Sequence, residues 1–475
     1  MHPEPVFKTK KMSKLKITGK QLRSLGFPEG PVISVAMQVI NSHYKHWEWD
    51  AVEALLTEVM THPKTFLEDE NLGKIAVKLV PEEKAEKYHD LLDKGIGFEV
   101  YGDEHIEQGA KHQMYTAVKL PIARLGALMP DAHQGYGLPI GGVLATEGAV
   151  IPYGVGVDIG CRMCLSVFDI RPSELVAKAG WFEQELIRST LFGSGAEFKS
   201  PSDHEVMESE VFGLNKLVKG LHHKAWKQLG SSGSGNHFVE FGIVEVDSLD
   251  EILKIPPGTY LGLLSHSGSR ALGANIANHY TKLAKSLCRL PGEAQNLAWL
   301  KLDEEAGHDY WHAMNLAGDY ASACHHVIHA KIAKSLKEKP IRMVENHHNF
   351  AWKEEVDGQE LIVHRKGATP AAQNALGIIP GSMTANGYIV KGKGNLASIN
   401  SASHGAGRLM SRSSAFKSIT EKMLKDVLSD HGVKLIGGGL DEAPFAYKNI
   451  DEVMVAQSGL VDVVGKFTPK LVRMA

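Results

Sequence analysis

The sequence contains little cysteine and no long hydrophobic run. Only four of its 475 residues are cysteines, too few for a disulfide framework, which indicates a reducing compartment. No apolar run reaches the ~18 residues that a membrane span needs. Residues 1–16, MHPEPVFKTKKMSKLK, lack the apolar core of a signal peptide. We therefore expect a cytoplasmic protein with no membrane partner.

A large excess of charge is also missing. Lys and Arg number 52 and Asp and Glu number 55, a formal net charge of -3. This balance argues against a protein coated in polyanion, but it permits a local basic groove for RNA or a nucleotide. There is no GxxxxGK[ST] loop, which excludes a P-loop nucleotidase. A KxDG-type motif, the lysine-nucleophile signature of ordinary nucleotidyl-transferring ligases, is also missing.

The spacing of apolar residues and of glycines divides the chain into two parts. Residues 1–17 read as a basic tail that we expect to be solvated, and residues 18–90 as a helical appendage. Apolar residues recur there at i, i+3, i+4 and i+7, first from Val32 to Val39 and then from Val52 to Val59. Asp50 is the expected N-cap of the second helix. This part carries no recognisable chemistry.

Residues 91–475 alternate short β-like runs with glycine loops and longer helical stretches. The expected strands include Val143–Ala145, Val155–Val157, Leu165–Phe168, Tyr260–Leu264, Tyr388–Val390 and Val433–Ile436. The expected helices lie near residues 207–229, 270–290, 302–337 and 414–429. The pattern predicts an α+β fold, a mixed core with functional groups on glycine-rich loops at strand ends.

The segment from Asp131 to Cys164 contains the densest set of reactive side chains. Asp158-Ile-Gly-Cys161 places a carboxylate and a thiol three residues apart, with Gly160 free to turn between them. Such a turn directs both groups at one metal ion. A buried glycine-rich turn with an unreactive core cysteine accounts for the same sequence. This stretch alone favours the two readings equally.

Further polar loops contain glycine or small residues beside potential ligands. Together with the thiol and the carboxylate, their imidazoles make a donor set that suits one or two divalent transition ions. The residue types alone favour zinc and manganese equally. Glycine-rich segments also expose backbone N–H groups to anionic oxygens, and nearby cations are possible phosphate or RNA contacts. Those cations are Arg270, Lys366 and Arg408. For Lys366 a structural ion pair is an equally good reading.

At this point the loops resemble the RtcB RNA ligases. The motifs PDAHQGYGLPIGGV, GVGVDIGCR, GSGNHFVE, SHSGSRALG, HNFA, HRKGATPA, PGSM and SHGAGR occur in this order in that family. The match runs from about residue 95 to near the C-terminus. The resemblance implies an RtcB-like catalytic domain over residues 91–475. It also implies ligation of RNA ends bearing a 3′-phosphate or 2′,3′-cyclic phosphate to 5′-hydroxyl ends, using GTP and two Mn²⁺ ions.

The resemblance also assigns residues. It implies metal ligation by Asp158, Cys161, His237, His266 and His348, with Cys161 bridging the ions, and guanylylation of His404. The implied nucleotide-binding residues are Asn236, His237, Glu240, His348, Asn349, Pro380, Gly381, Ser382, Met383, His404, Gly405, Ala406 and Gly407.

Two positions depart from the family pattern. Gly387 stands where the family has a serine that contacts the nucleotide. The chain ends in Arg473-Met-Ala475, where the family has a lysine-glycine pair whose lysine reaches the guanylate. These departures, together with the extra N-terminal unit, indicate a divergent branch. They keep two alternatives in view: a ligation-deficient RNA-end-binding protein, and a metal-dependent cyclic phosphodiesterase.

Overall fold

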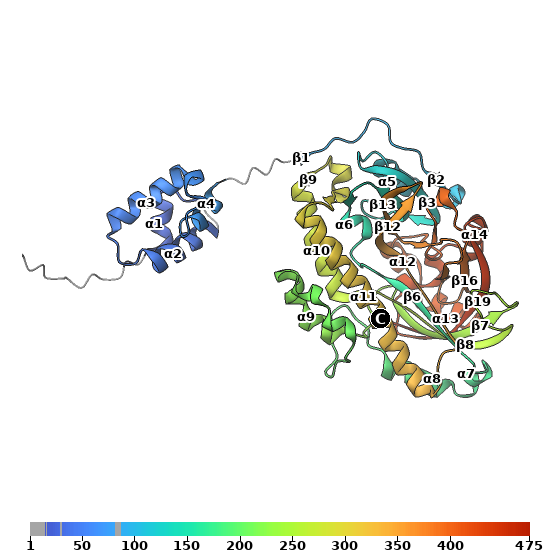
Figure 1. Cartoon of the computed structure of the whole chain (residues 1–475). Helices are drawn as coiled ribbons and strands as arrows, with labels where there is room; N and C mark the ends of the chain where they lie inside the picture. The colour runs from blue at the N-terminus through green and yellow to red at the C-terminus, as the bar shows by residue number, and fades with distance from the viewer. Residues whose placement is uncertain (1–14, 16, 29–30, 81–86) are drawn as a thin grey trace, which may run out of the picture. The chain divides into compact units, whose positions relative to one another are not determined.

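The structure is a computed structural model that describes residue 15 and residues 17–28, 31–80 and 87–475. The chain forms two compact units, residues 1–87 and residues 88–475 (Figure 1). The basic tail expected for residues 1–17 lies largely outside the described residues. Ile17 is buried in the core of the first unit, so the folded part begins before residue 18. That residues 91–475 carry all the chemistry stays a prediction.

The first unit is helical. Its helices are α1 (Gly19–Ser24), α2 (Pro31–His43), α3 (Trp49–Thr61), the 3-10 turn η1 (Pro63–Phe66) and α4 (Gly73–Leu79). Thr18 and Gln21 form a capping box at α1. The prediction that Asp50 caps α3 was wrong, because the preceding Trp49 is already helical. Asp50 instead lies in the first turn, where its charge favours the helix N-terminus.

The second unit contains two main sheets and confirms the predicted α+β fold. The larger has the order β11 (Arg342–His347), β6 (Arg162–Phe168), β8 (Gly258–Ser267), β7 (Phe238–Val246), β19 (Val461–Met474), β16 (Gly387–Gly392) and β15 (Leu376–Ile379), with β18 (Lys434–Ile436) beside β19. The smaller has the order β12 (Asn349–Val356), β13 (Gln359–Lys366), β4 (Ile140–Thr146), β3 (Ala123–His133) and β2 (Glu99–Val100). The short strand β14 (Ala368–Pro370) pairs with β17 (Ser401–Ser403).

Helices cover these sheets and fill the main core. They include α5 (Gln108–Ala117), α6 (Pro152–Val155), α7 (Ser173–Ala177), α8 (Ala179–Ser189), α9 (Lys216–Gln228), α10 (Arg270–Leu287), α11 (Glu305–Leu336), α12 (Arg412–Ser418), α13 (Glu421–Asp430) and α14 (Ile450–Ala456). The apolar faces of α10 and α11 meet in the largest buried cluster, around Tyr280, Tyr310 and Met314. No helix in the described part of the chain is long and apolar enough to cross a membrane.

Alternation along β6 and β8 separates the two faces of the larger sheet. Met163 and Leu165 of β6 pack with Leu264 of β8 on one face. Phe168 and Leu263 belong to a different cluster on the other face, with residues of α8 and α11. Successive side chains of a strand point to opposite faces, so neighbours of a residue that faces the cavity must face the helices.

Three predicted elements differ from the structure. Residues 155–157 do not form a strand, because Pro152 starts the short helix α6, which ends at Val155. The helix expected at 207–229 begins only at Lys216, where Asn215 caps it, after two 3-10 turns. The helix expected at 414–429 is two helices, α12 and α13, because Ile419 and Thr420 are extended. The helices predicted at 270–290 and 302–337 are confirmed as α10 and α11.

Candidate active site

Potential metal ligands gather at one edge of the larger sheet. Cys161 directly precedes β6 and His237 directly precedes β7, whereas His266 lies near the end of β8 and His348 follows β11. The four strands are neighbours in the order β11, β6, β8, β7, and each pair is antiparallel. Antiparallel pairing brings the start of one strand beside the end of the next. The sheet topology therefore places all four side chains together.

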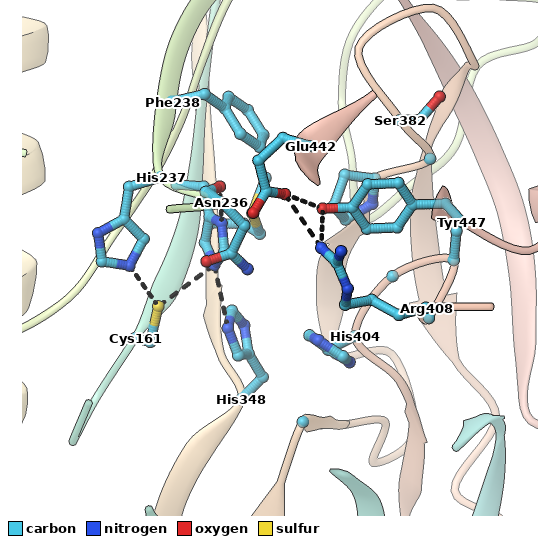
Figure 2. A pocket seen from close by; sticks show the side chains of 18 of the residues that line it. Cys161, Asn236, His237, Phe238, His348, Ser382, His404, Arg408, Glu442 and Tyr447 are labelled. Atoms are coloured by element: carbon cyan, nitrogen blue, oxygen red, sulfur yellow. Dashed lines mark hydrogen bonds and ion pairs between the residues drawn. The ribbon is translucent and has the colours of Figure 1, made fainter. Parts of the chain in front are cut away.

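Cys161 lies at the centre of this group. Its Sγ atom is 3.4 Å from Nε2 of His237 (Figure 2). It is also 3.2 Å from Nε2 of His266. The Nε2 atom of His266 also lies 3.2 Å from Nε2 of His348. On the other side, Oδ2 of Asp158 lies 2.9 Å from Nε2 of His237. The thiol therefore belongs to two groups of donors, one with Asp158 and His237 and one with His266 and His348.

Hydrogen bonding fixes the tautomer of His266 and leaves a lone pair in the centre of the group. The Nδ1 atom of His266 lies 3.0 Å from the carbonyl oxygen of Asn236, which can only accept, so Nδ1 carries the proton. Its Nε2 atom then presents a lone pair to Cys161 and His348. A backbone carbonyl is a common hydrogen-bond partner for the ring nitrogen that a metal-binding imidazole does not use for the metal.

The protonation states agree with a cation site. Burial, followed by the charge of His237, lowers the pKa of His266 to about 3, and burial lowers the pKa of His348 well below its usual value. Burial would raise the pKa of Asp158, but its bond to His237 and nearby charges outweigh burial and lower it to about 2. Burial and Asp158 raise the pKa of the Cys161 thiol, so a thiolate here requires a cation beside it. The donor set of thiol, carboxylate and imidazoles fits transition ions.

Gly160 makes the turn between Asp158 and Cys161 possible. Its φ of 69° lies in the left-handed region, and a Cβ atom there would come within 2.8 Å of the backbone of Gly318 on α11. The backbone N–H of Gly160 donates to the carbonyl of Asn349 at 2.7 Å. Only glycine satisfies both the backbone conformation and the close approach of the helix.

His404 faces this group from the other side of the cavity. It follows β17, and its ring centroid is 4.9 Å from that of His348. The carboxylate of Asp131, fully buried in β3, accepts from both Nδ1 and the backbone N–H of His404. The left-handed Gly407 lets the loop pass against the backbone of Asp131. Because Nδ1 donates to Asp131, the lone pair of His404 is on Nε2.

These groups line one cavity of about 390 Å³, within the range of about 300–1,000 Å³ that is typical of small-molecule sites. All the side chains and glycines that the resemblance assigned to metal or nucleotide line it. The predicted lining residues are Asp158, Cys161, Asn236, His237, Glu240, His266, His348, Asn349, Pro380, Gly381, Ser382, Met383, His404, Gly405, Ala406 and Gly407. Their binding roles stay predictions.

Asn349 already uses its side chain within the protein. Its Oδ1 atom accepts from the backbone N–H of Gly367 at 2.9 Å, and its Nδ2 atom donates to the carbonyl of Asp158 at 3.4 Å. The amide therefore links the Asp158 turn to the loop after β13. Asn349 also lines the cavity, next to His348.

The three expected phosphate contacts lie in different settings. Lys366 and Arg408 line the cavity, whereas Arg270 does not. Arg270 is buried and donates to the carbonyl of Gly193 at 3.2 Å. Burial lowers the pKa of Lys366 to about 7, and its ammonium donates to the carbonyls of Tyr136 and Tyr153.

One wall of the cavity was largely not predicted from the sequence. Arg408 contacts the buried Glu442 and lies over the ring of Tyr447, and the hydroxyl of Tyr447 donates to Glu442 (Figure 2). Arg412 pairs with both Asp441 and Glu442. Arg408 belongs to the SHGAGR loop and was expected here, whereas Arg412, Asp441, Glu442 and Tyr447 were missed. The glycines at 437–439, just before Asp441 and Glu442, were a local signal that could have indicated this wall. Asp131 was noted in the sequence but received no role.

The chain matches known proteins over most of its length. The family model described as tRNA-splicing ligase RtcB matches residues 113–220 and 196–474. RNA-splicing ligase RtcB of Escherichia coli strain K12 is 34% identical over 391 residues, which cover 76% of this chain and 92% of that protein. The tRNA-splicing ligase RtcB of Thermococcus kodakarensis is 30% identical over 448 residues, covering 78% and 93%. The chain belongs to the RtcB family.

The structure shows what occupies the two positions that depart from the RtcB pattern. Gly387 lines the cavity without a side chain. Met474, at the position of the family's penultimate lysine, is buried in the cavity wall and packs with Met383 and Val472. The guanidinium of Arg473 lies elsewhere, donating to the carbonyls of Leu186 and Thr190. Neither Arg473 nor Lys470 lines the cavity, whereas Arg412 does.

Proposed function

We propose that this protein is a GTP- and Mn²⁺-dependent RNA ligase. Its substrates are an RNA end with a 3′-phosphate or 2′,3′-cyclic phosphate and an RNA end with a 5′-hydroxyl. One observation carries the proposal: the free Nε2 of His404 faces the same cavity as the donors around Cys161, with the rings of His404 and His348 4.9 Å apart. Membership of the RtcB family supports the same activity.

The donor set suits two ions that share Cys161. Asp158, Cys161 and His237 would hold one, and Cys161, His266 and His348 the other. Mn²⁺ bound here supplies positive charge that neutralises the triphosphate of GTP and the phosphate of the RNA. The Nδ1 atoms of His237 and His348 have no hydrogen-bond partner among the described residues, so hydrogen bonds do not identify the tautomers of these two rings. For His266 the bond from Nδ1 to the carbonyl of Asn236 does identify the tautomer.

His404 is the proposed nucleophile. Its neutral Nε2 attacks the α-phosphorus of GTP, an N–P bond forms, the bond to the β-phosphate breaks, and pyrophosphate leaves. The ring then carries a positive charge, because Nδ1 keeps its proton. Asp131 balances that charge through the 2.6 Å bond to Nδ1. The carboxylate therefore both selects the reactive tautomer and stabilises the product.

The RNA steps follow from the guanylylated histidine. An oxygen of the RNA 3′-phosphate attacks the phosphorus on His404, and the P–N bond breaks to give an activated RNA-3′-pp-5′-G end. The 5′-hydroxyl of the second RNA attacks the 3′-phosphorus and loses its proton to solvent. The new phosphodiester P–O bond forms as the P–O bond to GMP breaks, and GMP leaves. A 2′,3′-cyclic end must first be opened by water to give the 3′-phosphate.

Glu240 is the proposed selector of guanine. It is buried in β7 and lines the cavity, where its carboxylate would accept from N1–H and N2–H₂ of guanine. Adenine does not offer that pair of donors. Burial raises the pKa of Glu240 well above its usual value, and the two donors of guanine would favour the charged form.

Incubation with α-³²P-GTP and Mn²⁺, followed by denaturing electrophoresis, tests this function. We expect a labelled band that acid removes and alkali does not, as for a histidine phosphoramidate. His404→Ala should lose the band and still bind metal. His431→Ala is the matched control, because His431 is an exposed imidazole bonded to Val427. A wild-type protein that binds Mn²⁺ but forms no band would contradict the proposal.

The absent side chain at Gly387 and the apolar Met474 favour one alternative, a protein that binds RNA ends without joining them. In that case binding of an RNA with a 3′-phosphate would be the same with and without GTP, and in His404→Ala. Joining of the two RNA ends by wild type, and not by His404→Ala, would exclude it.

A further inference from the structure

A buried polar network lies behind the metal donors, on the face of the larger sheet that packs against α11. It contains Ser166 of β6, Ser265 and Ser267 of β8, and His325 and His329 of α11. The two histidines are four residues apart and so share one face of the helix. His266 points to the cavity, so its strand neighbours Ser265 and Ser267 point to the helix.

One arrangement of protons satisfies every contact. The carbonyl of Ser267 lies 3.2 Å from Nε2 of His325 and can only accept, so this nitrogen carries the proton. The lone pair on Nδ1 of His325 then accepts from the hydroxyl of Ser265 at 2.6 Å. That hydroxyl accepts in turn from Nε2 of His329 at 2.7 Å. The Nδ1 atom of His329 accepts from Ser166 at 2.7 Å.

Both imidazoles are neutral in this order. Burial, and then the neighbouring His329, lowers the pKa of His325 well below its usual value. Burial and the charge of His326 lower the pKa of His329 to about 3. All four ring nitrogens therefore have partners, and the network runs in a single direction from Ser166 to the backbone of Ser267.

The His325 ring lies behind the strand and forms hydrogen bonds to the two chain neighbours of His266. One ring nitrogen bonds the residue before His266, and the other bonds the residue after it. The opposite side of His266 carries the Nε2 atom that faces Cys161 and His348. A shift of the strand at this point moves a proposed metal ligand directly.

We propose that His325, oriented by His329 through Ser265, is a positioning residue that holds His266 in place for metal binding. The inference rests on the proposed function, since it concerns a ligand of the proposed ions. All four ring nitrogens of His325 and His329 are hydrogen-bonded, and these bonds give directional constraints that an apolar core cannot give. Loss of a group that orients a metal ligand commonly changes metal affinity about 10- to 100-fold. His325 would act on His266 through its chain neighbours Ser265 and Ser267.

The nearby Cys164 raises a competing possibility, a metal ion held by Cys164, His325 and His329 themselves. The three groups are buried close together. However, the His329 nitrogen nearest the thiol is 4.0 Å from Sγ and only 2.7 Å from the Ser166 hydroxyl. Both nitrogens of His325 are also engaged. The geometry therefore favours the hydrogen-bonded network.

The test is Mn²⁺ binding to the full chain by isothermal titration, without GTP or RNA. His325→Leu removes both bonds at similar volume, and we expect about 10- to 100-fold weaker Mn²⁺ binding. His325→Gln should recover most of the affinity, because its amide can accept from Ser265 and donate to Ser267. The control is His364→Leu, a buried imidazole whose nitrogens bond Ile151 and Leu144. It should lower the melting temperature without weakening Mn²⁺ binding.

The outcomes separate the two proposals. Wild type that binds no Mn²⁺ contradicts the proposed function. Wild type and His325→Leu binding Mn²⁺ equally well overturns the positioning role while the function stands. Affinity that tracks melting temperature across His325→Leu, His325→Gln and His364→Leu also overturns it. The competing metal site is tested by counting metal ions per chain with inductively coupled plasma mass spectrometry. One additional ion in wild type that is lost in Cys164→Ala would establish that site.

Discussion

The Oδ2 atom of Asp131 accepts two hydrogen bonds from His404, at 2.6 Å from ring Nδ1 and at 3.1 Å from the backbone N–H. Asp131 is fully buried, and Lys448 donates to the carbonyls on either side of it. Two bonds from one residue fix the orientation of the ring as well as its tautomer. The bond to Nδ1 leaves the Nε2 lone pair of His404 free, as the proposed attack on GTP requires.

Asp131→Asn tests whether the carboxylate of Asp131 makes His404 reactive. The substitution keeps the shape but removes the charge that balances the guanylylated ring and favours the Nδ1–H tautomer. We expect histidine guanylylation at least about 100-fold slower in single-turnover labelling with α-³²P-GTP, with Mn²⁺ affinity unchanged. Asp451→Asn, at a surface carboxylate that accepts from Tyr388, is the control. An Asp131→Asn protein labelled at the wild-type rate would show that the contact is structural only.

Cys161→Ala tests the sharing of one ligand by two ions. Its thiol belongs to both donor groups, so its loss should weaken both sites and abolish the GMP adduct. The measurement is the number of Mn²⁺ ions bound per chain at equilibrium, with two expected for wild type. Cys288→Ala, at a buried thiol outside the cavity, should keep both ions. Two ions retained in Cys161→Ala would refute the bridging assignment.

Lys366 predicts a pH dependence. Its ammonium contacts two carbonyls and, among the described residues, has no carboxylate in an ion pair, which favours a phosphate contact over a structural pair. Burial lowers its pKa to about 7, so the charge is present below that pH and is lost above it. Affinity for an RNA 3′-phosphate end should therefore fall as pH rises through 7.

Fluorescence anisotropy with a 3′-phosphate oligonucleotide measures this effect, and a 3′-hydroxyl oligonucleotide corrects for contacts elsewhere. Lys366→Met should bind the 3′-phosphate weakly at every pH and lack the fall. Lys422→Met, at an exposed residue of α13, should behave as wild type. The same fall in Lys366→Met as in wild type would assign the titration to another group.

The sequence predicted the donor loops well because short-range features mark them. Glycine beside cysteine, aspartate or histidine indicates a tight turn that presents a side chain, as at Gly160 and Cys161. The same local reasoning predicted a phosphate contact for Arg270, and this role stays a prediction. Arg270 does not line the cavity and donates to the carbonyl of Gly193, but its charge contributes to the low pKa of Asp158. Local reasoning also read Val155–Val157 as a strand, although the preceding proline starts a helical turn.

The remaining parts of the site depend on long-range contacts that carry no local mark. Asp131 and His404 are 273 residues apart and meet only when β3 and β17 have packed. Glu442 and Tyr447 reach the cavity from residues 440–447, which follow the glycines at 437–439 but contain no histidine or cysteine. Neutral, buried histidines such as His325 are equally invisible, because their role follows from which strand residues lie behind the sheet.

Gly387→Ser tests whether the divergent cavity has lost affinity for the nucleotide. A Cβ atom at Gly387 would have its nearest neighbour at 3.4 Å, an ordinary contact, and the backbone there is not left-handed. The serine hydroxyl that the family pattern places here should add one hydrogen bond, about 0.5–1.5 kcal/mol, or roughly 2- to 10-fold tighter GTP binding. Equilibrium titration in a His404→Ala background avoids covalent chemistry. Gly387→Ala adds the carbon without the hydroxyl and should give no gain. If the serine variant binds GTP no better than the alanine variant, the missing hydroxyl is not what sets affinity in this cavity.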